Sequence, residues 1–304
     1  MNSTNRSWSC RTTGRGSRWR ESAITRPGLT GGRPGPGRHA DMMPSAARSG
    51  RVGTMMRAED VLAVLDLLDR AGIEVWLDGG WGVDALLCEQ TRPHEDLDIV
   101  VRAETLADYA RTMRENGFRL WRDDGPYNQV LVDDAGRLVD VHAVDLGVTR
   151  TDERGVEVYG PGGLPYPVGS LTGSGRVRGR RVDCGTVRFQ IASHTGYAID
   201  EDDERDVLAL HHRFGVPLAA RVRAWHEEDG WGVLDAANLR EDVWAHFSAV
   251  AGDDYAEPAV GQAVTFSLDE ELEEAAGTAR QGGYRRRAMT VWPEGAALST
   301  VTWS

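Results

Sequence analysis

Two aspartates separated by one residue, Asp96 and Asp98, are the first candidates for chemistry in this chain of 304 residues. They lie in Glu95–Val101, where acidic and apolar residues alternate, so we expect a strand with both carboxylates on one face. Adjacent carboxylates repel each other, and a divalent cation between them removes that cost. Because hard oxygen ligands suit Mg²⁺, Asp96 and Asp98 are predicted to bind magnesium.

A pair of glycines, Gly79 and Gly80, precedes this strand and directly follows a short apolar run, Ile73–Leu77. The run is expected to be a buried strand, and glycine allows a sharp turn and the close approach of a ligand. The next segment, Trp81–Cys88, is expected to be a helix whose free N–H groups point back at the glycines and favour an anion. The pattern therefore predicts a phosphate-binding turn before the magnesium-binding strand.

A later strand, Leu138–His142, offers a third carboxylate. Val139 and Val141 are expected to face the core, which leaves Asp140 and His142 on the other face. From the pattern alone, Asp140 fits a functional residue or a solvated aspartate on an edge strand. His142 is more commonly a structural histidine than a functional one.

The combination of Gly79-Gly80 with Asp96-x-Asp98 resembles the nucleotidyltransferase superfamily. The fuller strings D-G-G-W-G-V-D-A-L-L and Q-T-R-P-H-E-D-L-D are similar to its antibiotic-modifying branch, the aminoglycoside 2″-adenylyltransferases and lincosamide nucleotidyltransferases. The resemblance covers roughly Met56–Leu218, and H-T-G-Y-x-x-D-E-D-D-x-x-D-V near its end again looks like the lincosamide branch. It implies an α+β fold, a polymerase-beta-like mixed sheet with helices.

The resemblance also implies an activity, the Mg²⁺-dependent transfer of a nucleoside monophosphate from an NTP to a hydroxyl group. AMP from ATP is expected, and the acceptor would be a small molecule such as an aminoglycoside or a lincosamide. Asp140 matches the acidic residue that completes the carboxylate triad. It would either join Asp96 and Asp98 at the metal or take the proton from the acceptor hydroxyl.

The same resemblance assigns nucleotide binding to four residues. Gly79 and Gly80 would hold the phosphates of the NTP, and Arg92 would neutralise their charge. His94 would assist, although Arg92 and His94 fit equally well as residues that only brace the loop before the metal-binding strand.

Charge is distributed unevenly along the chain. The formal net charge is −12, but residues 1–58 carry eleven Arg against Glu21 and Asp41, a net charge of +9 that leaves −21 for the remainder. An acidic folded part argues against a general nucleic-acid-binding surface. All 35 basic residues are Arg, which excludes P-loop kinases and Schiff-base enzymes because both need lysine.

The three cysteines form no C-x-x-C pair, and no apolar run is long enough to span a membrane. A cytoplasmic protein is therefore expected. Residues 1–55 are rich in Arg, Gly, Ser and Pro and are expected to be disordered. Their composition fits a transit peptide. A start codon placed too far upstream is favoured, with translation beginning at Met55 or Met56, because nothing before Met55 resembles the family.

The catalytic domain is expected to span residues 56–217, with an amphipathic helix at Ala58–Ala71, a further helix at Ala103–Asn116 and an acidic helix at Asp200–Phe214 that ends at Gly215. Pro217–Ala220 is expected to be a short linker. Beyond it, strands and turns over Ala220–Pro293 resemble a cold-shock domain, a small all-β OB-type barrel, so residues 218–304 are expected to form such a domain.

The second resemblance implies weak binding of single-stranded nucleic acid through stacking aromatic residues. The candidates for stacking are Trp225, Trp231, Trp244, His246 and Phe247. However, Glu227-Glu228-Asp229 stands where the family often has lysine, and Asp269–Glu274 adds a run that repels phosphate. Two readings stay open: a barrel that keeps its fold but binds nucleic acid poorly, and a cold-shock-type binding protein whose transferase domain is idle or modifies RNA.

Overall fold

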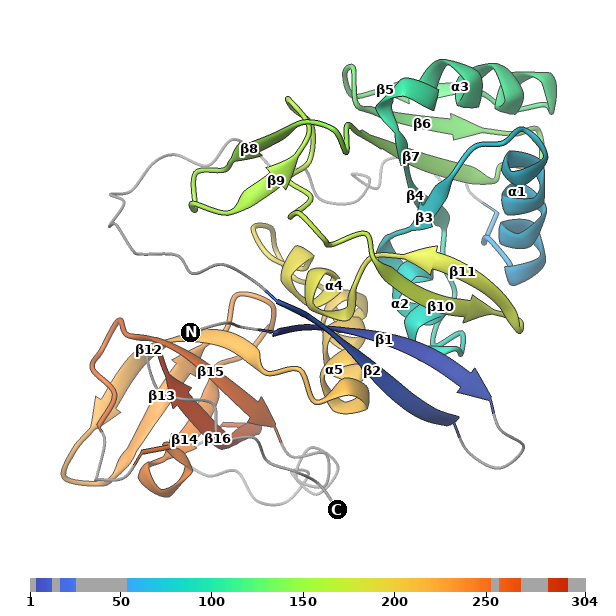
Figure 1. The fold of residues 1–304 in the computed structure, drawn as a ribbon. Coiled ribbons are helices and arrows are strands. Elements are labelled where there is room, and N and C mark those ends of the chain that lie inside the picture. The colour runs from blue at the N-terminus through green and yellow to red at the C-terminus, as the bar shows by residue number, and fades with distance from the viewer. Residues whose placement is uncertain (1–3, 13–16, 26–53, 253–256, 269–283, 295–304) are drawn as a thin grey trace. The chain divides into compact units, whose positions relative to one another are not determined.

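The computed structural model describes residues 4–12, 17–25, 54–252, 257–268 and 284–294. The chain divides into two compact units, Met1–Gln190 and Ile191–Ser304. Each unit is described by itself (Figure 1).

The first unit is built on a mixed sheet with the strand order β2-β1-β10-β11-β3-β4-β7-β6-β5 (Figure 1). The strands of this sheet are β1 (Thr4–Thr12), β2 (Ser17–Thr25), β3 (Val75–Leu77), β4 (Asp96–Arg102), β5 (Arg119–Asp123), β6 (Asn128–Val132), β7 (Leu138–Val144), β10 (Gly173–Val177) and β11 (Arg180–Cys184). A separate two-stranded sheet is formed by β8 (Thr149–Thr151) and β9 (Glu157–Tyr159). At the centre of the large sheet β4 and β7 are parallel, and β3 and β6 run antiparallel to them on either side.

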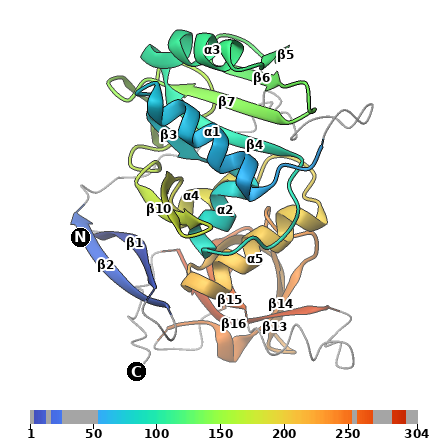
Figure 2. The same cartoon turned by 90° about the vertical axis from the view of Figure 1, so that its right-hand side faces the viewer.

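The helices that begin in this unit are α1 (Ala58–Arg70), α2 (Gly79–Leu87), the short 3₁₀ helix η1 (Ala103–Thr105), α3 (Leu106–Glu115) and α4 (Val187–Ser193). α1 is amphipathic, as predicted, and buries Val61, Leu65 and Leu68. It lies beside α3, as Figure 2 shows. Within the described residues, none of the helices is both long enough and apolar enough to cross a membrane.

The two faces of β4 and β7 differ as the alternation predicts. Leu97 and Ile99 on β4 and Val139 and Val141 on β7 are fully buried, whereas the acidic residues between them are only partly buried. Burying apolar side chains on one face fixes the register of each strand, because a shift by one residue would place them on the opposite face. The carboxylates are therefore held on the other face.

The second unit contains α5 (Glu201–Phe214), the 3₁₀ helix η2 (Phe247–Ala249) and a closed barrel with the order β12-β13-β14-β16-β15. The barrel strands are β12 (Leu218–His226), β13 (Trp231–Asp235), β14 (Val243–His246), β15 (Ala263–Leu268) and β16 (Arg286–Pro293). The predicted fold class is confirmed: a mixed sheet with helices precedes a small closed barrel of five strands.

Helix α5 packs on this barrel. Glu204 of α5 accepts hydrogen bonds from the backbone N–H of Arg240 at 2.8 Å and pairs with Arg286 at 3.0 Å. Nε2 of the buried His211 accepts a hydrogen bond from the backbone N–H of Leu268 at 3.0 Å. The sequence analysis assigned this helix to the catalytic domain, residues 56–217. In the structure its polar residues contact barrel elements of the second unit.

The predicted linker at Pro217–Ala220 is wrong, because β12 already begins at Leu218. Leu218 is fully buried and pairs with Phe266 of β15, and Ala220 pairs with Val264. The small residues suggested a linker, but Leu218, Ala220 and Val222 continue the alternation of the barrel.

Residues 1–55 also differ from the expectation of disorder. β1 and β2 pair antiparallel from Thr4–Thr25 to Thr12–Ser17, and β1 pairs with β10 at Ser9 and Ser174. A hairpin is stabilised by backbone hydrogen bonds between its strands. The amino-acid composition of a segment gives no information about these bonds. The Gly- and Pro-rich part of this segment and the acidic run Asp269–Glu274 lie outside the described residues.

Candidate active site

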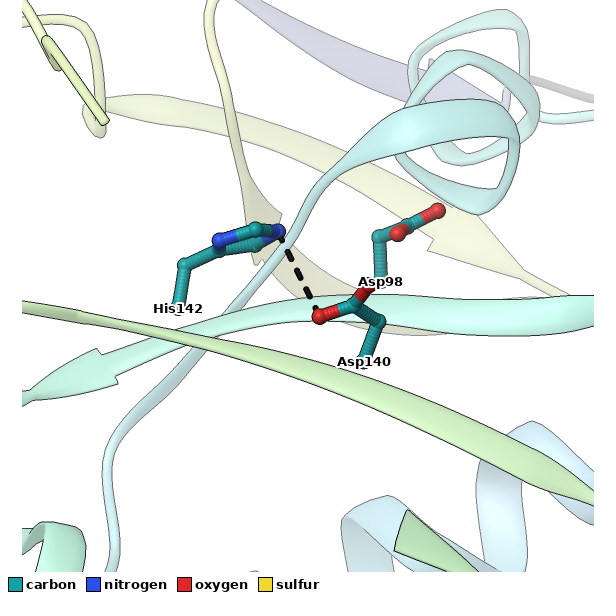
Figure 3. Close-up of side chains that lie close together, drawn as sticks. All are labelled: Asp98, Asp140 and His142. Carbon is teal, nitrogen blue, oxygen red and sulfur yellow. Dashed lines mark ion pairs between the residues drawn. The ribbon is translucent and has the colours of Figure 1, made fainter. Parts of the chain in front are cut away.

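Asp98 and Asp140 lie directly opposite each other on the parallel strands β4 and β7. His142 follows two residues later on the same face of β7, and its Nε2 lies 3.6 Å from Oδ1 of Asp140. One ligand atom from each of these three side chains lies within 4.8 Å of the others, and Figure 3 shows the imidazole pointing toward the Asp140 carboxylate. Three side chains that can each bind a metal ion thus meet on one face of the sheet.

Asp96, the other predicted ligand, occupies the same face two residues before Asp98 and has Leu138 as its cross-strand partner. It is not among the three side chains that meet within 4.8 Å. The negative charge of Asp96 nevertheless raises the pKa of Asp98. Its role as a metal ligand stays a prediction.

The carboxylates are held in an unfavourable electrostatic environment. Burial raises the pKa of Asp98 well above its ordinary value, and the charges of Asp96 and Asp140 raise it further, whereas Arg92 opposes them. Burial also raises the pKa of Asp96 and of Asp140. Desolvated like charges disfavour ionisation, and a divalent cation would reverse that effect. The donor set and its excess negative charge therefore fit a bound divalent metal ion.

Asp140 and His142 share a neighbour, Asn128, that the sequence analysis missed. Nδ2 of Asn128 donates to Oδ1 of Asp140 at 3.1 Å and lies 2.7 Å from Nδ1 of His142. The antiparallel register of β6 and β7 places Asn128 opposite His142. Arg122 lies at the other oxygen of Asp140, with Nη2 at 3.7 Å. This contact depends on the register between β6 and β7, which the local sequence pattern does not specify.

Helix α2 begins at the glycine pair itself. Gly79 has a φ of +53°, and a Cβ atom there would overlap Oδ2 of Asp98 and lie 2.8 Å from its Cγ. A Cβ atom on Gly80 would press against Nδ1 of His94 and lie 2.8 Å from Nη2 of Arg92. The absence of side chains thus lets the metal-binding strand and the loop before it approach the start of the helix. The predicted turn is the first turn of α2.

A second residue that the sequence analysis did not single out, Asp78, connects this helix start to the sheet. Its backbone N–H donates to the backbone oxygen of Asp98 at 3.0 Å. The buried Tyr166 donates its hydroxyl proton to Oδ2 of Asp78 at 2.7 Å, and Nε2 of Gln190 donates to Oδ1 at 2.9 Å. These contacts fix where the N–H groups of the first turn of α2 lie relative to Asp98.

His94 is placed deep in the protein, with 2% of its surface exposed. Its Nε2 lies 2.5 Å from Oδ2 of the buried Asp84, and its ring centroid is 4.8 Å from that of Trp81. The other oxygen of Asp84 accepts hydrogen bonds from the backbone N–H of Thr91 at 2.9 Å and from its hydroxyl at 2.7 Å. The pair therefore holds the loop between α2 and β4 in place.

Comparison with known proteins relates residues 60–210 to a known family. The profile of the aminoglycoside-2''-adenylyltransferase family matches residues 60–210. Those residues form a nucleotidyltransferase domain of the aminoglycoside-2''-adenylyltransferase type. A lincosamide resistance protein from Staphylococcus haemolyticus is 26% identical over 153 residues, which are 50% of this chain and 92% of the relative.

Two solved structures of similar proteins contain an antibiotic or its adenylylated product. A lincosamide antibiotic adenylyltransferase with lincomycin bound has 24% identity, covers 52% of this chain and 98% of its own, and has a TM-score of 0.44. ANT(2'')-Ia in complex with adenylyl-2''-tobramycin has 20% identity, covers 52% of this chain and 89% of its own, and has a TM-score of 0.40.

The family match ends at residue 210, before the first strand of the barrel, so it says nothing about the barrel. Three of the five predicted stacking residues, Trp244, His246 and Phe247, are connected by ring contacts. Centroids lie 5.8 Å apart for Trp244 and His246 and 4.3 Å apart for His246 and Phe247, and Trp231 is the cross-strand partner of His246.

Trp231 extends this group to two further rings, those of His226 at 4.0 Å and Tyr284 at 6.3 Å. The fifth predicted residue, Trp225, is placed differently: its ring covers Gly232, where a Cβ atom would lie 2.6 Å from Cζ3. We refer to Trp231, His246, Phe247, His226 and Tyr284, with the buried Trp244 beneath the guanidinium of Arg287, as the aromatic cluster.

Proposed function

We propose that the nucleotidyltransferase domain transfers AMP from ATP to a hydroxyl group of a small antibiotic-like acceptor such as an aminoglycoside or a lincosamide, and so acts in antibiotic resistance. The observation that carries the proposal is the placement of Asp98 and Asp140 side by side at the glycine start of α2. The lincomycin and tobramycin seen with similar proteins support the choice of acceptor class.

The first turn of α2 would bind the phosphates. Its free N–H groups at Gly79 and Gly80 can donate to phosphate oxygens, and the glycines leave room for them. Arg92, which lies against Gly80, would add a positive charge. His94 would act as a positioning residue, because its Nδ1 edge lies against Gly80 while its Nε2 is held by Asp84.

Asp98, with Asp96 and Asp140, would hold Mg²⁺, which when bound supplies charge neutralisation at the triphosphate and the leaving pyrophosphate. Alternatively, Asp140 would stay outside the metal site and take the proton from the acceptor hydroxyl. Burial raises its pKa, so it holds a proton more readily than an ordinary aspartate. The hydroxyl oxygen then attacks the α-phosphorus in line, the bond to the bridging oxygen breaks, and pyrophosphate leaves.

The test is a mass-spectrometric screen of hydroxylated antibiotics incubated with the full chain, ATP and Mg²⁺. We expect an acceptor whose mass rises by one adenylyl group, together with release of pyrophosphate. Asp98→Asn and Asp140→Asn should abolish the product while the protein stays folded. A product that forms equally well in both variants would contradict the assignment of the site.

A second function, weak binding of single-stranded nucleic acid by a cold-shock-like barrel, is favoured by the aromatic cluster alone. Base stacking on aromatic side chains contributes ~1–3 kcal/mol per base. Trp231→Ala should weaken the binding of a single-stranded RNA in a salt-dependent filter assay, whereas Trp292→Ala, on β16 and outside the cluster, should not. Equal binding by the three proteins would exclude the cluster as the binding surface.

A further inference from the structure

His142 is placed to do more at this site than support the strand. Its ring lies on the same face as Asp98 and Asp140, and its side chain is 12% exposed, close to the 16% of Asp140. Sequence reasoning favoured a structural histidine here. However, a structural histidine in a sheet has no need to share its position with two carboxylates that burial already penalises.

We propose that His142 is a direct metal ligand through Nε2, and that the resulting site of two carboxylates and one imidazole binds Mn²⁺ in preference to Mg²⁺. The inference rests on the proposed function, because it uses the same metal site. It adds a ligand and a metal preference that the aspartate motif does not contain.

The distances suit shared coordination. In an octahedral site with ligands at about 2.1 Å, neighbouring ligand atoms are about 3.0 Å apart and opposite ones about 4.2 Å apart. The separation of 3.6 Å between Nε2 of His142 and Oδ1 of Asp140 falls between these values. The ligand atoms of Asp98, Asp140 and His142 all lie within 4.8 Å of one another. This separation is only slightly larger than the ~4.2 Å between opposite ligands of an octahedral site, so small side-chain rotations would bring the three atoms to one ion.

Asn128 provides the support that a metal-binding histidine requires. A ligating imidazole usually donates its second N–H to a carbonyl or carboxylate oxygen, which fixes the ring and leaves the other nitrogen for the metal. The Asn128 amide lies 2.7 Å from Nδ1 of His142, and its Oδ1 is buried with no hydrogen-bond partner among the described residues. Rotating the amide by half a turn exchanges Nδ2 and Oδ1. Oδ1 then accepts the proton of Nδ1, and the hydrogen bond from Nδ2 to Oδ1 of Asp140 is given up, so that this carboxylate oxygen is left to the ion. The lone pair of Nε2 is also free to bind the ion.

The preference for Mn²⁺ over Mg²⁺ follows from the chemistry of the ligand atoms. Mg²⁺ is bound by oxygen ligands and keeps much of its water shell. Mn²⁺ shares the preference for oxygen ligands but, as a first-row transition metal, accepts an imidazole nitrogen more readily than Mg²⁺ does. Replacing a water or carboxylate oxygen with an imidazole nitrogen therefore favours Mn²⁺ over Mg²⁺. The negative charge of the two aspartates still permits Mg²⁺ to bind.

The experiment is electron paramagnetic resonance of Mn²⁺ added to the full chain without nucleotide. Titration gives the Mn²⁺ affinity, competition with Mg²⁺ gives the preference, and electron spin echo modulation detects a directly bound imidazole nitrogen. We expect the nitrogen signal in the wild-type protein and its loss in His142→Ala, with Mn²⁺ affinity reduced roughly tenfold or more. Asn128→Leu should weaken Mn²⁺ binding more than Mg²⁺ binding. His212→Gln, a change at an imidazole on α5 of the second unit, should keep the nitrogen signal.

The outcomes separate this inference from the proposed function. Mn²⁺ that binds in an Asp98-dependent way but without a nitrogen signal would overturn the role of His142 and leave the carboxylate site standing. A nitrogen signal that persists in His142→Ala would overturn it as well. If neither Mn²⁺ nor Mg²⁺ binds to the full chain or to its complex with ATP, both proposals fail.

Discussion

The carboxylate of Asp98 occupies the space that a side chain on residue 79 would need. A Cβ atom on Gly79 would lie 2.8 Å from Cγ of Asp98 and overlap one of its oxygens. The first turn of α2 and the metal-binding strand β4 are therefore in direct contact, and the N–H groups proposed to hold phosphate begin where the carboxylates end.

The first prediction compares two glycines that both have positive φ values. Gly79→Ala should lower metal affinity and transfer by at least ~100-fold, because the carboxylate of Asp98 must leave its present position to make room for the new Cβ atom. Gly72→Ala is the matched control: its φ is +72°, yet no atom of the described residues lies within 4 Å of the new Cβ. Both variants should lose about 1 kcal/mol of stability from backbone strain, measured by thermal unfolding. Equal metal affinity in the two variants would show that the close contact between Gly79 and Asp98 does not matter for metal binding.

The second prediction concerns stability in the absence of metal. The pKa of Asp98 is raised in the folded protein and returns to about 3.8 on unfolding. Between these values the folded state binds more protons, so the free energy of unfolding falls as the pH rises through that window. At neutral pH the desolvated carboxyl group of Asp98 is therefore a net cost to stability, which Asp98→Asn removes.

In a chelator-containing buffer at neutral pH, Asp98→Asn should therefore melt a few degrees higher than the wild type, since about 1 kcal/mol shifts the melting temperature by ~2–4 °C in a domain of this size. Added Mg²⁺ or Mn²⁺ should raise the wild-type value and leave the variant unchanged. A variant that melts lower than the wild type in chelator would show that Asp98 stabilises the fold instead.

The third prediction tests the buried pair of Asp84 and His94. Asp84→Ala leaves the imidazole and both hydrogen-bond donors of Thr91 without their acceptor, and should lower the free energy of unfolding by about 3 kcal/mol. Asp134→Ala is the control, because that side chain is 98% exposed and its pair with Arg119 should contribute little. Denaturant unfolding of the two variants measures the difference, and similar losses would contradict a bracing role.

Alternation along the strands was enough to predict the faces of β4 and β7, and hence that Asp98 and Asp140 are candidates. Their direct opposition depends on the register between two strands that are distant in sequence, which local pattern does not specify. Asn128 could not be predicted for the same reason, because its contact with His142 depends on the register between β6 and β7.

Helix α5 shows a different limit of sequence reasoning. The predicted bounds, Asp200–Phe214, agree with the structure to within one residue, because Asp200 is the N-cap and Gly215 the C-cap of Glu201–Phe214. Its amphipathic pattern says that one face is buried but not which element covers it. Contacts of Glu204 and His211 with barrel residues determine that, and they involve residues far along the chain.

The fourth prediction follows from those contacts. Glu204→Ala should destabilise the second unit by about 1–3 kcal/mol, because it leaves the backbone N–H of Arg240 and the guanidinium of Arg286 without this acceptor. Glu201→Ala, in the same turn of α5, is the control: that side chain is 75% exposed and its pair with Arg240 spans 3.3 Å. Thermal unfolding followed by tryptophan fluorescence compares them. Metal affinity should be unchanged in both, and a loss of metal binding in Glu204→Ala would contradict the separation of the two roles.

The most direct measurement of the central claim is the release of pyrophosphate from ATP by the full chain, with a divalent metal ion and a panel of hydroxylated antibiotics. The account predicts release that depends on both the acceptor and the metal, one adenylyl group gained by the acceptor, and loss of at least ~100-fold in rate in Asp98→Asn and Asp140→Asn. Acceptor-dependent release that survives in both variants would show that the transfer chemistry lies elsewhere in the protein.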